Sequence, residues 1–257
     1  MKIQFYLYVF LTSLFFFSCL SASNQKSKFQ ADWDVWLSAF NNSDTTGITE
    51  QYLSKSAILI NNELVQSDSI LGSFLLKNLK TDNFKISQKL TLKIFEHDSA
   101  RFMETGYFVM NNENPRKIYF ITAWLKKNNA WKREVDIFYS ASENEIDTTV
   151  FSDRKRDWVR FSNAHDAAQL INNLYHTDAF YLSKGRLDRG TEAITARYRY
   201  MDKPTWTVDL KSSAIIPVSD TIVYEIGRWV TKSKSGYFLI VWQYRAASWK
   251  ILIDFNF

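Results

Sequence analysis

The chain contains one stretch of sequence twice, and this repeat constrains the fold more than any other feature. Residues 119–139 read YFITAWLKKNNAWKREVDIFY, and residues 237–257 read YFLIVWQYRAASWKILIDFNF, so the stretches align without a gap. The identical positions are Tyr119/Tyr237, Phe120/Phe238, Trp124/Trp242, Trp131/Trp249, Lys132/Lys250 and Asp136/Asp254. Because tryptophan is rare and a pair of tryptophans recurs at one spacing, the similarity indicates a duplicated architecture.

The similarity extends upstream at slightly different offsets, which indicates small loop insertions between two copies of one fold. Further matched pairs are Trp36/Trp158, Asn41/Asn163, Asp44/Asp166, Ala57/Ala179, Leu64/Leu187, Glu104/Glu225 and Gly106/Gly227. The 257 residues accommodate two domains of ordinary size. We predict domains at residues 28–140 and 156–257, joined by a polar linker at 141–155.

Each half is predicted to begin with helices and to end in a sheet. Trp33, Trp36, Leu37 and Phe40 recur at helical spacing. Two more helices are expected at 48–53 and 69–79, the latter capped by Ser67, with a short strand at 57–61 between them. Alternating apolar residues then predict strands at 89–95, 100–110, 118–126 and 131–139. The fold class is therefore α+β.

The N-terminus has the pattern of an export signal. Met1 and Lys2 precede an apolar run that ends near residue 17, followed by small residues. The run is too short to span a bilayer as a helix. Cys19, the only cysteine, lies where a bacterial lipobox places its lipidated cysteine, although Phe16 stands where leucine is usual. We expect a signal peptide at residues 1–22 and a lipid-anchored protein of the periplasm or outer membrane; the alternative is cleavage beyond Cys19, after Ala22 or Ser23.

Composition and motifs exclude several classes of function. The net charge of +5 includes basic clusters at 154–156 and 186–199, but no recognition motif accompanies them, so no nucleic-acid partner is expected. The three histidines are scattered and the mature part lacks cysteine, so no metal site is expected. No phosphate-binding or dinucleotide fingerprint is present, and no cofactor is expected.

The order of elements resembles the nuclear transport factor 2-like superfamily. Helical segments lead into a long antiparallel meander ending in W-x6-W-K-x3-D, and NAHDAAQLINNLYHTDAFYL followed by LDRGTEAI looks like the opening of its SnoaL-like and ketosteroid-isomerase-like group. The first half departs by having Ser67 where Gly190 stands. The resemblance implies cone-shaped domains in which a curved sheet wraps the helices around an apolar pocket. It also implies pairing through the sheets, either as an intrachain pseudo-dimer that buries much of the aromatic surplus or as a homo-oligomer.

Candidate site residues concentrate in the second half. Tyr175, Tyr181 and Trp206 have no clear identical partner in the first half, so they suit a half-specific pocket, although ordinary packing also explains them. Asp254 and Glu225 are carboxylates that could act as a general acid or base if burial raised their pKa. A structural role is favoured for both because each recurs in the first half. Arg228 is expected near Glu225, and Asp254 is expected on the strand face opposite Trp249 and Ile251.

Three functions follow from these expectations. The first is binding of a small apolar ligand or an envelope protein through the second domain's pocket, without catalysis. The second is a SnoaL-like isomerase or cyclase that uses a pocket carboxylate. The third is a structural interaction module whose pockets are filled by side chains. Whether the protein is an enzyme stays open, with the non-catalytic reading favoured.

Overall fold

The computed structural model describes residues 29–257 except 61–62, 68, 81–84, 112–115 and 141–145. The predicted signal peptide and Cys19 lie outside the described residues. Within the described ranges, no helix is long and apolar enough to cross a membrane.

The first domain consists of three helices and a six-stranded mixed sheet. Its helices cover residues 29–41, α2 (Thr45–Thr49) and α3 (Leu71–Leu79). Its strands are β1 (Tyr52–Ile60), β2 (Glu63–Gln66), β3 (Lys85–Asp98), β4 (Arg101–Asn111), β5 (Arg116–Lys127) and β6 (Ala130–Tyr139). The sheet order is β2-β1-β6-β5-β4-β3, in which only β1 and β6 pair in parallel.

The second domain repeats this arrangement. Its helices are α4 (Thr149–Asn163), α5 (Ala167–Leu174), α6 (Thr191–Tyr198) and the 3-10 turn η1 (Arg199–Asp202). Its strands are β7 (Tyr175–Ser183), β8 (Arg186–Arg189), β9 (Val208–Ser219), β10 (Ile222–Thr231), β11 (Ser235–Arg245) and β12 (Ser248–Asn256), in the order β8-β7-β12-β11-β10-β9. The predicted α+β fold, with helices packed on a sheet in each of two domains, is confirmed.

Several boundaries differ from the prediction for local reasons. Helix α4 begins at Thr149, inside the predicted linker, because Phe151 is buried against Trp242 and Trp249 just as Phe29 packs on Trp124 and Trp131. The helix expected at 48–53 instead covers 45–49, since the Asp44 side chain caps it by accepting from the Gly47 N–H. Helix α3 begins at Leu71 rather than Ser69, and the Ser67 hydroxyl accepts from the Ser69 N–H, which precedes the helix.

A β-bulge in the last strand of each domain reverses the expected faces. In β12 the pairing with β11 shifts between Val241 and Trp242, which pair with Ile253 and Ile251 respectively, so that Leu252 is the extra residue. Ile251 therefore faces the interior together with Asp254, and the expectation that it lies on the opposite face was wrong. The same shift in β6 leaves Glu134 as the extra residue and turns Arg133 inward with Asp136.

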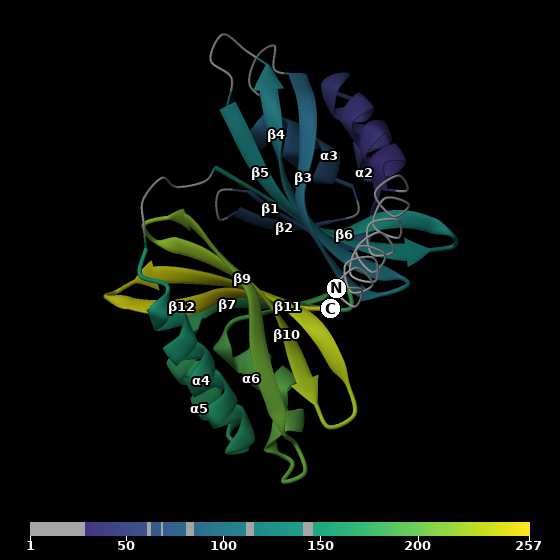
Figure 1. The fold of residues 1–257 in the computed structure, drawn as a ribbon. Helices are drawn as coiled ribbons and strands as arrows, with labels where there is room; N and C mark the ends of the chain where they lie inside the picture. The colour runs from purple at the N-terminus through teal and green to yellow at the C-terminus, as the bar shows by residue number, and fades with distance from the viewer. Residues whose placement is uncertain (1–28, 61–62, 68, 81–84, 112–115, 141–145) are drawn as a thin grey trace, which may run out of the picture.

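The two sheets pack against each other. Figure 1 shows the teal strands of the first domain lying above the green and yellow strands of the second. One apolar cluster joins them, with Ile137 and Val135 from the first sheet and Leu239 and Val241 from the second. The Tyr139 and Tyr224 rings meet edge to face at 5.0 Å between centroids. All nine tryptophans lie instead in the separate interiors of the two domains, so the shared core buries less of the aromatic surplus than expected.

Candidate functional site

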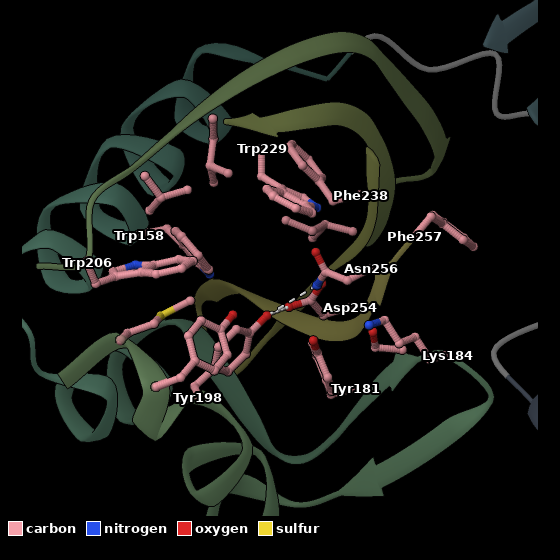
Figure 2. A pocket seen from close by; sticks show the side chains of 16 residues that line it. Trp158, Tyr181, Lys184, Tyr198, Trp206, Trp229, Phe238, Asp254, Asn256 and Phe257 are labelled. Atoms are coloured by element: carbon pink, nitrogen blue, oxygen red, sulfur yellow. Dashed lines mark hydrogen bonds between the residues drawn. The ribbon is translucent and has the colours of Figure 1, made fainter. Parts of the chain in front are cut away.

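The second domain contains a cavity of about 200 Å³ between its helices and the concave face of its sheet (Figure 2). Helix α4, the α6–η1 segment and strands β7 and β9 to β12 all contribute to its walls. The lining is mainly aromatic: Trp158, Tyr181, Tyr198, Tyr200, Trp206, Trp229, Phe238 and Phe257. Met201, Val208, Leu210 and Ile240 add aliphatic surface, and Ser183, Lys184, Asp254 and Asn256 are the polar members.

Asp254 is the acidic group of this cavity and is only 2% exposed. The hydroxyls of Tyr175 and Tyr198 both donate to its Oδ2 at 2.6 Å, and the Asn256 amide donates to its Oδ1 at 2.9 Å. Burial raises the pKa of this carboxyl to about 6, although the two tyrosine hydrogen bonds act in the opposite direction. Asp254 is therefore a buried carboxyl that titrates near neutral pH.

Neighbouring contacts hold the aromatic walls in place. The Trp206 indole N–H donates to the Ser162 hydroxyl at 2.9 Å, and Tyr200 meets the Trp206 ring edge on at 4.8 Å. Tyr198 packs edge to face with Tyr181 at 5.0 Å. The Trp229 indole N–H is buried and has no hydrogen-bond partner among the described residues. A buried donor of this kind is available to a ligand oxygen.

The first domain has the same Tyr–Asp pair, but its interior is filled. The Tyr52 hydroxyl donates to Asp136, as that of Tyr175 does to Asp254. Phe40 and Phe138 stack on Trp36, with centroids at 5.2 and 6.0 Å. The second domain carries Ser162 and Asn256 at the positions of Phe40 and Phe138. These two smaller side chains help to leave the second interior open.

An arginine also occupies the first interior. Arg133 corresponds to Ile251, since both pair with the repeated tryptophan and with the repeated tyrosine of the adjacent strands. Its Nη1 donates to Asp136 at 2.7 Å, and its guanidinium carbon lies 3.7 Å from the centroid of Trp33. The first domain therefore places its own cation in its interior.

Glu225 and Arg228 lie outside the cavity. Glu225 faces the domain interior, where the Trp242 indole N–H donates to it at 2.9 Å and the Ser212 hydroxyl donates to its other oxygen. Arg228 is exposed, with its side chain on the Ser235 hydroxyl and the Tyr237 ring. The structure does not bring either residue to the Asp254 site.

Of the other predicted site residues, Tyr181, Trp206 and Asp254 line the cavity, whereas Tyr175 stands behind Asp254 as its hydrogen-bond donor. Tyr175 does have a counterpart, Tyr52, at the offset of the Leu64/Leu187 pair. Tyr198 and Asn256 were not predicted as site residues, and Trp158 was predicted only as a match to Trp36. Comparison of Phe138 with Asn256 was the available signal for an opening in the second domain.

No group of three or more His, Cys, Asp or Glu side chains in the described part of the chain is arranged to hold a metal ion. The Nδ1–H of His165 donates to the Met201 carbonyl, 3.0 Å away, and the Nε2–H of His176 donates to the Gln243 carbonyl, 3.1 Å away. Both histidines thus make local contacts with the backbone.

No protein-family model matches the chain. No curated protein matches it either. Similar solved structures include a nuclear transport factor 2-like protein of unknown function from Shewanella oneidensis, with 12% identity, a TM-score of 0.38, and coverage of 44% of this chain and 98% of that one. A ketosteroid isomerase-like protein from Erwinia carotovora has 12% identity and a TM-score of 0.38, covering 45% and 95%. A nuclear transport factor 2-like protein with a cystatin-like fold from Novosphingobium aromaticivorans has 6% identity and a TM-score of 0.41, covering 49% and 88%.

The observed architecture is the one that the nuclear transport factor 2-like resemblance implies, present twice. Each domain packs helices on one face of a six-stranded mixed sheet. The first domain has a filled interior and the second an open one. The chain thus contains this α+β architecture twice, and the second copy carries the candidate binding site.

Proposed function

We propose that the second domain binds a small organic molecule in the cavity beside Asp254. One observation carries the proposal: the duplicated fold leaves this cavity where the first domain has packed side chains. Its volume of about 200 Å³ exceeds the roughly 150 Å³ of an engineered apolar cavity that binds benzene. A ligand of one ring, or of comparable bulk, matches this space.

The character of the walls supports an oriented ligand. Aromatic and aliphatic side chains make up most of the lining residues, which favours an apolar body. Asp254 and Asn256 on β12, and the Trp229 N–H on β10, which has no partner among the described residues, supply a few polar contacts. The filled interior of the first domain fits the reading of a structural module, so binding is assigned to the second domain.

Filling the cavity with the first domain's own side chain tests this proposal. Asn256→Phe introduces the residue that occupies the equivalent position, Phe138. We expect native mass spectrometry of the protein purified from its source to detect a retained small molecule on the wild type and none on Asn256→Phe. Asn173→Phe makes the same substitution on the exposed face of α5 and should retain the molecule. Equal retention by both variants would contradict binding in this cavity.

A second candidate function is acid–base catalysis of the isomerase or cyclase kind. Asp254 supports it, because a buried carboxyl with a pKa of about 6 exchanges protons near neutral pH. Any molecule identified on the protein, and its double-bond isomers, are the first substrates to assay. Asp254→Asn should abolish turnover while the circular dichroism spectrum stays unchanged. Turnover that survives this substitution would reject the catalytic role of Asp254.

We further propose that the protein is exported and anchored by a lipid on Cys19. The support is the sequence pattern of residues 1–22. Intact mass measurement of the membrane fraction should show a diacylglycerol-modified chain that begins at Cys19, and Cys19→Ala should release the protein from the membrane. An unmodified chain that begins after Ala22 or Ser23 would contradict the anchor.

A further inference from the structure

The two domains bury acidic side chains at equivalent positions but differ in the cations that accompany them. In the first domain, Asp136 pairs with Arg133 at 2.7 Å and Glu104 pairs with Lys89 at 2.5 Å. In the second domain, Glu225 has Lys155 within 3.8 Å. Asp254 takes part in none of the ion pairs between described residues. It alone of these four carboxylates is buried without a cation.

The difference arises from substitutions in the strands. Ile251 stands at the position of Arg133. Leu210 stands at the position of Lys89. The residue after Lys89 places its carbonyl oxygen close to Gly106, and the residue after Leu210 places its carbonyl oxygen close to the equivalent Gly227. The second domain has thus kept its buried acids and lost two interior cations. Three neutral donors satisfy the oxygens of Asp254, but they do not neutralise its charge.

The first domain shows which group accompanies the equivalent carboxylate, Asp136. The Arg133 guanidinium lies over the faces of Trp33, Trp36 and Trp124, at 3.7, 4.7 and 4.7 Å from the ring centroids. Trp158, the counterpart of Trp36, lines the open cavity of the second domain. Tyrosines and two further tryptophans surround the same space (Figure 2). Aromatic faces combined with a carboxylate are the recognition chemistry of organic cations.

We propose that the second domain's cavity binds a small organic cation, an ammonium or guanidinium compound, which supplies beside Asp254 the charge that Arg133 supplies beside Asp136. This inference rests on the proposed binding function and names its ligand class. Lys184 is the only basic residue in the cavity lining, and its side chain is exposed at the rim. The ligand is therefore a monocation whose charged group lies inward and whose neutral end faces Lys184.

Two sets of molecules with matched shape and different charge test the inference on the full chain. The first set is choline, 3,3-dimethylbutan-1-ol and 3,3-dimethylbutanoate. The second is benzylammonium, benzyl alcohol and phenylacetate. Affinities are measured at pH 8 by calorimetry and by tryptophan fluorescence after removal of any retained molecule. We expect at least one cation to bind about tenfold or more tightly than its neutral and anionic counterparts, the preference that a desolvated cation–aromatic contact provides.

Variants connect the preference to the site. Asp254→Asn should reduce the affinity of the cation to that of its neutral counterpart. Asp178→Asn is the matched control, since it removes one negative charge from a half-exposed side chain of β7, where Asp178 pairs with Arg245, and should leave the preference intact. Trp206→Leu keeps an apolar wall but removes an aromatic ring, so it should reduce the affinity for the cation more than the affinity for the neutral molecule. It serves as the second variant if Asp254→Asn does not fold.

The outcomes separate the two proposals. If the neutral or anionic molecules bind as tightly as the cations, the cation inference is overturned and binding in the cavity stands. If no member of either set binds, and Asn256→Phe also retains the source-derived molecule, both proposals fall. An unchanged cation preference in both Asp254→Asn and Trp206→Leu would likewise overturn the inference, because the charge would be recognised elsewhere.

Discussion

At the scale of single residues, Asp254 is the position where burial and charge oppose each other most directly. Its pKa in the folded protein is about 6, above the ordinary value of 3.8. The groups that face it are neutral over this range: Tyr175, Tyr198 and Asn256. The folded state therefore takes up a proton more readily than the unfolded chain does. The contribution of Asp254 to the free energy of unfolding is fully present below about pH 4 and is lost as the pH rises through about 6.

Asp254→Asn removes this dependence. We expect the free energy of unfolding of the variant, relative to wild type, to rise by up to about 3 kcal/mol between pH 4 and pH 7, because each pKa unit corresponds to about 1.4 kcal/mol. Urea unfolding at both pH values measures the change. Asp178→Asn is the control: hydrogen bonding to Arg245 lowers the pKa of Asp178 from its ordinary value of 3.8, so its contribution is lost only below about pH 4, and the relative stability of this variant should change little between pH 4 and pH 7. A relative stability of Asp254→Asn that is equal at both pH values would contradict the expected titration.

At the scale of elements, a glycine in each domain positions an aromatic wall. Gly106 and Gly227 lie in strands beside a bulged neighbour, as expected for a glycine inside a curved sheet. At Gly227 an added Cβ would lie 2.3 Å from the Phe238 ring and 2.5 Å from the Lys211 carbonyl oxygen. Phe238 lines the cavity, so the glycine allows this ring to cross the strand closely.

Gly227→Ala should destabilise the protein by about 1–3 kcal/mol, the usual range for overpacking. Thermal and urea unfolding measure the loss. Shortening the opposing ring in Gly227→Ala/Phe238→Leu should recover part of it, so that the two substitutions are not additive. Additive losses would show that the ring does not oppose the new methyl group. The recovery of stability should be incomplete, because the Lys211 carbonyl also opposes the new methyl group and no side-chain substitution removes a backbone carbonyl.

Strand alternation predicted where the strands lie, but not which way every side chain faces. Each final strand contains a bulge that depends on its pairing with the neighbouring strand, and no local residue type marks it. The bulge brings Arg133 into the first interior and Ile251 into the second. The pairing of Tyr175 with Asp254 was hidden for another reason. The counterpart of Tyr175, Tyr52, matches it at an offset of 123, whereas the flanking pairs Asp44/Asp166 and Ala57/Ala179 match at 122, so the tyrosine pair is displaced by one residue in the alignment.

The repeat predicted the two domains well because buried tryptophans tolerate few replacements. It was less informative about the site, where equivalent residues share a scaffold but differ in volume. Asp254 is common to both domains, yet it lines a cavity only where Ser162 and Asn256 replace two phenylalanines. Tyr198, from α6, donates to Asp254 without an evident sequence signal. The cavity in the second domain therefore depends on the side chains at several positions together.

At the scale of the whole molecule, the shared core between the sheets makes the two domains depend on each other. The apolar rows on the faces where the two sheets meet would be exposed to water if either domain unfolded alone. The Tyr237 hydroxyl also donates to the Glu96 carbonyl of the other domain at 2.6 Å. We therefore expect the full chain to unfold in one cooperative calorimetric transition.

Substitutions across the shared core test this coupling. Tyr139 and Tyr224 meet at 5.0 Å, one from each domain, and both are buried. Tyr224→Ala should cost about 3 kcal/mol, as large-to-small changes in a core do. Tyr139→Ala combined with it should cost less than the sum by about 1 kcal/mol, since aromatic pairs contribute this much beyond their buried area. Tyr244→Ala, on an exposed ring of β11, is the matched control and should change stability little. Two separate transitions in the wild type, together with additive effects of the two tyrosines, would mean that each domain is stable without the other. A single transition that broadens or splits in Tyr224→Ala would show that the shared core couples the unfolding of the two domains, so that the filled first domain stabilises the open second domain.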